Sequence, residues 1–230
     1  NSTKNIEWIR SRNPDVIFCF GWSHLLKSEL LEIAPLGVVG YHPAALPANR
    51  GRHPVIWALV LGLSEIASTF FFMDKGVDSG DILSQQQISI EEKDDAEILY
   101  RKLMQTALKQ LEQFVAALAS GDFERIPQDH SKANTWRKRD RNDGKIDWRM
   151  TAKSIHNLVR GLTKPYVGAH FELNDKQIKV WKTKVISNQE INIEPGKVLA
   201  VSGEGIVIKA GQDLIQLRDI EPSIEIAPGT

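Results

Sequence analysis

The chain has 230 residues, enough for one large domain or two small ones with a substantial core. Lysine plus arginine and aspartate plus glutamate number 29 each, so the formal net charge is zero, which argues against a dedicated nucleic-acid-binding protein. The apolar runs are far shorter than a membrane span, no signal peptide is visible, and Cys19 is the only cysteine, so we expect a cytoplasmic protein with no membrane partner and no metal site.

The first half of the chain alternates expected helices and strands. Apolar spacing and capping residues predict helices over 2–12, 23–34, 54–61 and 96–120 and strands over 15–20, 37–41, 66–73 and 82–90. The run 15–20 is continuously apolar, which is typical of a parallel strand buried on both faces. This alternation predicts an α/β fold with a Rossmann-like parallel sheet. Such a domain normally begins with a strand, so we expect further N-terminal strands ahead of Asn1.

The character of the chain changes in the second half. Residues 129–147 are polar and unperiodic and are interpreted as a linker, and a helix is expected over 147–164. Short alternating strands separated by glycine-containing turns follow, at 167–173, 177–185, 196–201, 206–210 and 213–220. They predict a small β-barrel of the OB-like kind. We therefore divide the chain into a catalytic core (1–128), a linker (129–147) and a C-terminal domain of one helix plus the barrel (148–230).

Two titratable side chains stand out in the first half. His42 follows the strand at 37–41 and precedes a proline-bounded loop, and Asp78 lies in a glycine-flanked loop after the strand at 66–73. The carboxyl ends of parallel strands meet at one edge of a sheet, where open α/β sheets bind ligands. A histidine beside a carboxylate is an acid–base pair that works near neutral pH. Alone, Asp78 is an ordinary turn residue and His42 an ordinary core histidine, so the interpretation depends on the two together.

Longer motifs restrict the possible functions of the chain. The chain has no dinucleotide-binding glycine motif, no P-loop and no nucleophile elbow. The segments YHPAALPANRGRHPVIWAL (41–59) and GVDSGDIL (76–83) resemble the folate-dependent formyltransferase family, which includes methionyl-tRNA formyltransferases and sugar N-formyltransferases. The positions that match the family pattern are His42, Pro47, Arg50, Gly51, Asp78 and Gly80. The linker, the helix after it and KPYVGAHF (164–171) resemble the second domain of the transfer-RNA and sugar enzymes, so the resemblance covers nearly the whole chain.

The resemblance implies formyl transfer from N10-formyltetrahydrofolate to a primary amine. His42 would move a proton or, as imidazolium, stabilise the oxyanion, and Asp78 would orient it. The folate contacts that the resemblance implies are Trp22, Leu25, Leu26, Met73, Asp74, Gly76 and Val77. The acceptor contacts that we expect are Tyr41, Arg50, Trp136, Arg137 and Arg139.

One position departs from the family pattern. The family has asparagine two residues before the histidine, and this chain has Gly40, which lacks a side-chain donor for the oxyanion. Losing such a donor costs on the order of 3–4 kcal/mol in other enzymes. Three interpretations stay open: a weakened enzyme, another donor such as Asn49, Tyr41 or His53, or a protein that binds folate or a sugar nucleotide without catalysis.

The acceptor is less sharply indicated. The basic side chains of the linker would suit a phosphate on a nucleotide-linked sugar or on transfer RNA alike. The zero net charge and the short barrel favour a small acceptor. We therefore expect an amino-sugar N-formyltransferase of surface-glycan synthesis, with a methionyl-tRNA formyltransferase as the alternative.

Overall fold

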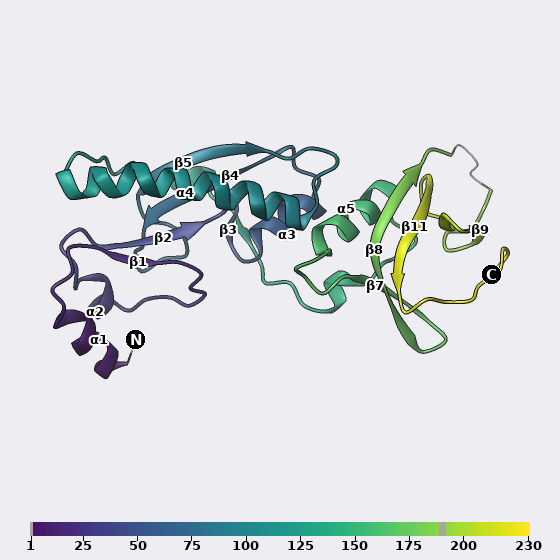
Figure 1. Ribbon diagram of the computed structural model, residues 1–230, viewed down its shortest axis with the longest axis horizontal. Helices are drawn as coiled ribbons and strands as arrows, with labels where there is room; N and C mark the ends of the chain where they lie inside the picture. Colours follow the sequence, from purple (N-terminus) through teal and green to yellow (C-terminus); the bar gives the residue numbers. More distant parts are fainter. Residues whose placement is uncertain (1, 189–191) are drawn as a thin grey trace. The chain divides into compact units, whose positions relative to one another are not determined.

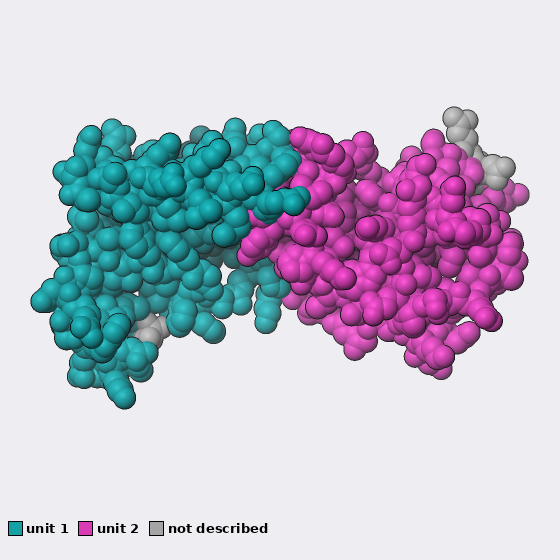
Figure 2. Space-filling model, in the orientation of Figure 1, with its two compact units in different colours: residues 1–54, 65–89, 101–138 teal, residues 55–64, 90–100, 139–230 magenta. Residues whose placement is uncertain are grey.

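The computed structural model describes residues 2–188 and 192–230. Asn1, where the predicted core begins, lies outside the described residues. The chain separates into two compact units (Figure 2), which are described one at a time. Residues 1–54, 65–89 and 101–138 form the first unit, and residues 55–64, 90–100 and 139–230 form the second. In the described ranges, none of the helices combines the length and the apolarity that a membrane crossing requires.

Most of the expected elements of the first half are present. The helices are α1 (Thr3–Arg10), α2 (Ser28–Leu31), α3 (Pro54–Val60) and α4 (Ala96–Ser120). The strands are β1 (Ile17–Cys19), β2 (Val38–His42), β3 (Arg50–Gly51), β4 (Glu65–Phe72), β5 (Ile82–Ser89) and β6 (Thr135–Trp136). Two predicted capping residues are confirmed. The Ser2 side chain accepts from the Asn5 N–H at the start of α1, and Gly121, with φ +77°, follows the end of α4.

The sheet of the first unit has the order β1-β2-β4-β5. The parallel pairing that the alternation predicts joins β1 to β2, whereas β2–β4 and β4–β5 are antiparallel. From Arg101 on, α4 belongs to this unit and packs along the sheet, as Figure 1 shows. Its buried residues Ala107, Phe114 and Leu118 share a core with strand residues Val39, Phe70 and Phe72. This packing leaves the opposite face of β2, with Gly40 and His42, for the site described below.

Two expectations about the start of the chain are wrong. The helix predicted over 23–34 shrinks to the four residues of α2, and Lys27 before it is extended at ψ 155°. The leucine spacing there suggested a helix, but the Ser23 carbonyl accepts from the Arg52 guanidinium at 2.5 Å, which holds the segment in a non-helical path. The strand predicted over 15–20 is only three residues long, and Phe18 is 41% exposed, because β1 lies at the edge of the described sheet.

The second unit contains the predicted helix and antiparallel strands. The helix is shorter than expected, α5 (Ala152–Leu162), because the Thr151 side chain caps it by accepting from the Ser154 N–H. The strands are β7 (Ala169–Leu173), β8 (Lys176–Ile186), β9 (Val198–Ser202), β10 (Gly205–Lys209) and β11 (Leu214–Glu221). Their order is β7-β8-β11-β10-β9, so β7 and β9 are edges and no barrel closure is found among the described residues. One face of α5, including Ile155 and Val159, packs on Ile178, Val180 and Ile215.

The stretch interpreted as a linker is more ordered than expected. It holds two short 3-10 helices, His130–Lys132 and Asn142–Gly144, and strand β6, which pairs in parallel with β3 through Arg50↔Thr135 and Gly51↔Trp136. Sequence periodicity cannot reveal a two-residue strand, because two residues do not define a period. This small sheet belongs wholly to the first unit and shapes its site.

His156 makes the stability of the second unit depend on pH. Burial and the neighbouring charges of Arg160 and Lys153 lower the pKa of His156, against a smaller opposing effect of Glu92. The unfolded chain therefore binds a proton more readily than the folded one near the ordinary histidine pKa. The free energy of unfolding should fall as pH drops from 7.5 to 5.5, measured by urea denaturation. In His156→Gln the fall should be smaller; an equal fall would show that His156 does not carry this dependence.

Candidate active site

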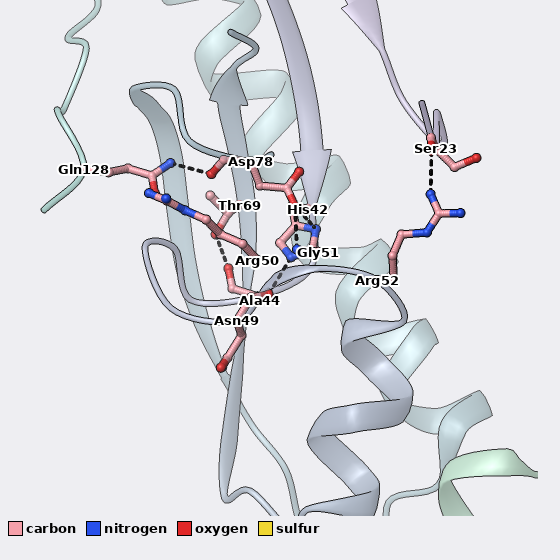
Figure 3. Close-up of polar contacts among 10 residues, drawn as sticks. All are labelled: Ser23, His42, Ala44, Asn49, Arg50, Gly51, Arg52, Thr69, Asp78 and Gln128. Atoms are coloured by element: carbon pink, nitrogen blue, oxygen red, sulfur yellow. Dashed lines mark hydrogen bonds and ion pairs between the residues drawn. The ribbon is translucent and has the colours of Figure 1, made fainter. Parts of the chain in front are cut away.

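His42 and Asp78 lie in contact, as predicted. His42 Nδ1 is 3.6 Å from Asp78 Oδ2, and the His42 side chain is buried (Figure 3). On the other side of the ring, Nε2 is 2.8 Å from the Asn49 carbonyl oxygen. A carbonyl can only accept, so this contact is a hydrogen bond donated by Nε2–H. A second proton, on Nδ1, would face the carboxylate, so the charged form of His42 would have an acceptor at each nitrogen.

The route by which Asp78 reaches His42 differs from the expected one. Because β4 runs antiparallel to β2, its carboxyl end lies beside the start of β2, where the Met73 N–H donates to the Val38 carbonyl at 2.7 Å. The loop after β4 then brings Asp78 back to His42, at the far end of β2. Asp78 itself has φ +49°, a left-handed conformation that is costly for a non-glycine residue. The two residues meet through this returning loop and not through parallel strand ends.

The carboxylate of Asp78 is fixed by a backbone donor. The Gly51 N–H donates to Asp78 Oδ2 at 2.8 Å. Gly51 has φ +102°, and a Cβ atom at this position would collide with the Trp136 carbonyl oxygen of the paired strand β6. Only glycine fits here, so the β3–β6 pairing aims one N–H at the carboxylate.

A cavity of about 320 Å³ adjoins the pair on the Asp78 side. Its volume falls within the range of small-ligand sites. Six of the seven residues expected to contact folate line it, together with two of those expected to contact the acceptor: Trp22, Leu25, Met73, Asp74, Gly76, Val77, Trp136 and Arg137. Asp78 also lines the cavity, whereas His42 does not and is only 6% exposed. Leu26 is buried instead in a core cluster with Leu30 and Val38.

Asp74 shapes the wall of this cavity. Its Oδ1 accepts from the Gly76 N–H at 2.9 Å and from the Ser79 hydroxyl at 2.7 Å. A side chain at Gly76 would run into that hydroxyl. Asp74 therefore folds the 74–79 loop on which Asp78 is carried.

Three residues expected to contact the acceptor lie away from the cavity. Tyr41 is on the opposite face of β2, with its ring 4.8 Å from Phe70. Arg139 belongs to the second unit, where its guanidinium lies 4.5 Å from the Trp57 ring centre. Arg50 is buried, 8% exposed, and its Nη2 bonds to Gln128. Of the five expected contacts, only Trp136 and Arg137 remain at the cavity.

The space that an asparagine side chain at position 40 would need is occupied by Met73, the residue that follows β4. A Cβ atom on Gly40 would lie 2.8 Å from Met73 Cγ and 3.2 Å from Phe71 Cε1. Two of the three alternative donors are also misplaced: Asn49 turns its carbonyl to His42 while its side chain points away (Figure 3), and Tyr41 accepts from the Ser68 hydroxyl on the other face. The Met73 side chain thus occupies the space that a longer residue at 40 would need.

This packing predicts the behaviour of an asparagine at position 40. Gly40→Asn alone should lower the free energy of unfolding by about 1–3 kcal/mol, because it overpacks the site against Met73. Combined with Met73→Ala, it should recover stability and raise kcat above that of Met73→Ala alone. Urea denaturation and the rate of tetrahydrofolate release measure the two effects. A double variant no faster than Met73→Ala would show that a side-chain donor at 40 is not what limits turnover.

Some residues of the site were missed by sequence reasoning: Arg52 lines the cavity, and Gln128 joins Arg50 to the Asp78 loop. Lys138, one of the basic linker side chains expected near a phosphate, also lines the cavity. Gln128 sits in a polar stretch without a motif, and no local signal marks it. Across the described ranges, no three His, Cys, Asp or Glu side chains gather as ligands for a metal ion.

Two family models match the chain. Residues 1–115 match the model described as "Formyl transferase", and residues 138–226 match "Formyl transferase, C-terminal domain". A methionyl-tRNA formyltransferase from Desulforamulus reducens is 32% identical over 213 residues, which cover 93% of this chain and 67% of the relative.

Solved structures share the fold at lower identity. WlaRD, a sugar 3N-formyl transferase solved in the presence of dTDP and 5-N-formyl-THF, is 18% identical with a TM-score of 0.71, covering 94% of this chain and 77% of that one. HypX from Aquifex aeolicus, solved with tetrahydrofolic acid, is 19% identical with a TM-score of 0.68; the match covers 94% of this chain but spans only 37% of HypX.

Proposed function

The chain belongs to the formyl transferase family, and we propose that it transfers a formyl group from N10-formyltetrahydrofolate to the amine of an amino sugar, with His42 and Asp78 as the acid–base pair. The observation that carries this proposal is the contact of the two side chains at 3.6 Å beside a cavity of about 320 Å³. A lone titratable residue in a wall would support binding only, whereas a paired histidine and carboxylate supports proton transfer.

The cavity suits the donor. Its apolar and aromatic walls, from Trp22, Leu25, Phe71, Met73 and Val77, fit a flat heterocycle such as a pterin. Two solved relatives point the same way, since HypX was solved with tetrahydrofolic acid and WlaRD in the presence of 5-N-formyl-THF. The donor would supply a formyl carbon whose bond to nitrogen breaks as a bond to the acceptor nitrogen forms.

His42 and Asp78 would transfer the proton that the acceptor amine loses. Asp78 reaches the cavity and His42 lies behind it, so the pair would take the proton lost by the acceptor amine and return it to the donor nitrogen as tetrahydrofolate leaves. The Gly51 N–H holds the carboxylate, and the Asn49 carbonyl holds the far nitrogen of the ring. Both partners are therefore oriented before a ligand arrives, which is the arrangement that general acid–base catalysis requires.

The cavity's charges support a phosphate-bearing acceptor. Arg52, Arg137 and Lys138 line it, against two carboxylates, Asp74 and Asp78. A nucleotide-linked amino sugar carries a diphosphate that such cations would bind. The second candidate acceptor is methionyl-tRNA, favoured by the relative that is 32% identical over 93% of the chain. A third reading, binding without turnover, is favoured by Gly40.

Measuring tetrahydrofolate release distinguishes transfer to an amino sugar, transfer to methionyl-tRNA and binding without turnover. The chain would be supplied with N10-formyltetrahydrofolate and, in parallel, a dTDP-linked amino sugar, methionyl-tRNA or no acceptor. Release with the sugar nucleotide alone is the expected result. Release with methionyl-tRNA alone would replace the sugar by the second candidate. Donor binding without release in any mixture would leave a binding protein.

A further inference from the structure

Gln128 closes a ring of contacts around Asp78. Its Nε2 donates to the carbonyl oxygens of Asp78 at 2.9 Å and Gly80 at 2.6 Å, and its Oε1 accepts from Arg50 Nη2 at 2.5 Å. The next residue after Arg50 is Gly51, whose N–H holds the Asp78 carboxylate. Asp78 is thus held through its side chain and its backbone by one connected set of groups (Figure 3).

The members of this ring are buried. Gln128 is 7% exposed and Arg50 is 8% exposed. Arg50 Nη2 also lies 3.0 Å from His130 Nδ1, so this nitrogen of the guanidinium is shared between two protein acceptors. A buried amide that loses its partners is costly, and hydrogen bonds to a charged group are stronger than neutral ones. The ring is therefore suited to hold the strained left-handed backbone of Asp78 in one place.

From this geometry we propose that Gln128 and Arg50 are positioning residues for the acid–base pair, acting through Asp78. Arg50 then serves the reaction from behind the loop and not by contact with the acceptor. The inference rests on the proposed function, because it assigns a role in that reaction. Its physical content, that Gln128 fixes Asp78 against His42, does not need turnover to be tested.

Gln110 provides a matched control. It is also a buried glutamine of the first unit, 2% exposed, and its Nε2 donates to the Ser68 carbonyl at 3.2 Å and the Ser84 hydroxyl at 2.8 Å. None of these partners lines the cavity or contacts Asp78. Gln110→Met therefore removes a buried side-chain amide, as Gln128→Met does, but at a place where the positions of His42 and Asp78 should not change.

Kinetics form the first arm of the test. Gln128→Met should lower kcat by roughly 10–100-fold with a smaller change in KM for the donor, because displacing a reacting group by about 1 Å costs rate and not binding. Gln128→Glu should show a similar loss, because it keeps an acceptor for Arg50 but no longer donates to the loop. Gln110→Met should keep the parent kcat. Parent-like kcat in Gln128→Glu, or an equal loss in Gln110→Met, would overturn the proposal.

The second arm is independent of turnover. The His42 ring signals would be recorded by NMR in the parent chain, Gln128→Met and Gln110→Met, and assigned by their absence in His42→Gln. The expected result is a shift of the His42 signals in Gln128→Met and no shift in Gln110→Met. Unchanged His42 signals in Gln128→Met would refute the positioning role. If the parent released no tetrahydrofolate, the proposed function would fail while this arm still decided the inference.

Discussion

Asp78→Asn should lower kcat for formyl transfer by about 10²–10⁴-fold, and His42→Gln should lower it by a similar factor. Asparagine has the shape of aspartate, and its carbonyl oxygen can still accept from the Gly51 N–H, so the loop should stay folded while the charge facing His42 Nδ1 is lost. Steady-state release of tetrahydrofolate measures the loss. Urea denaturation of the same variants checks that folding is preserved.

The double variant tests whether the two side chains act as one unit. Residues that share a catalytic step lose little more when both are removed than when one is, whereas independent residues multiply their losses. We expect Asp78→Asn with His42→Gln to be about as slow as either single variant. A double variant slower by the product of the two factors would show that the pair does not share the proton.

Gly51→Ala should destabilise the chain strongly. The methyl group would meet the Trp136 carbonyl oxygen, and φ +102° is unfavourable for any side chain. Left-handed strain of about 1–3 kcal/mol and overpacking of about 1–3 kcal/mol together predict a loss of about 2–6 kcal/mol in the free energy of unfolding. Activity should fall as well, because any shift of the Gly51 N–H releases the Asp78 carboxylate. Urea denaturation gives the first quantity and tetrahydrofolate release the second.

Gly121→Ala separates strain from collision. Gly121 also has a left-handed backbone, at φ +77°, but a Cβ atom there would find nothing within 4 Å. It should therefore cost only the strain, about 1–3 kcal/mol, and leave kcat unchanged. If both glycine variants lost the same stability, the contact with Trp136 would not matter.

The parts of the site that could be predicted are those with a local chemical signature. His42 directly precedes a loop rich in proline, and Asp78 lies in a loop rich in glycine; these residue types are typical of specific turns. The alternation of a strand could also have placed Tyr41 correctly, since it must point away from the face that carries Gly40 and His42. We expected Tyr41 at the site because the family resemblance outweighed this simple geometric rule.

The parts that could not be predicted depend on contacts between distant segments. Arg50 and Gln128 are 78 residues apart, and neither the charge of one nor the amide of the other indicates that they meet. The helix expected at 23–34 failed for the same reason: its leucines have helical spacing, but a contact with Arg52 holds Ser23 in another path. Contacts with distant segments decide the local structure in both cases, one of them buried and the other at the surface.

The pairing of β3 with β6 determines where this chain can be joined to a different C-terminal domain. Gln128 directly precedes the stretch that its composition suggests is a linker, and β6 lies within that stretch. Gln128 holds the Asp78 loop, and β6 pairs with Gly51, whose N–H donates to the Asp78 carboxylate. A chimera that exchanges the C-terminal β-domain at residue 128 would import a foreign 129–136 and with it a foreign neighbour for Gly51. A crossover placed after Lys138 keeps this chain's own segment, so the joint between interchangeable modules lies about ten residues further along than the polar composition suggests.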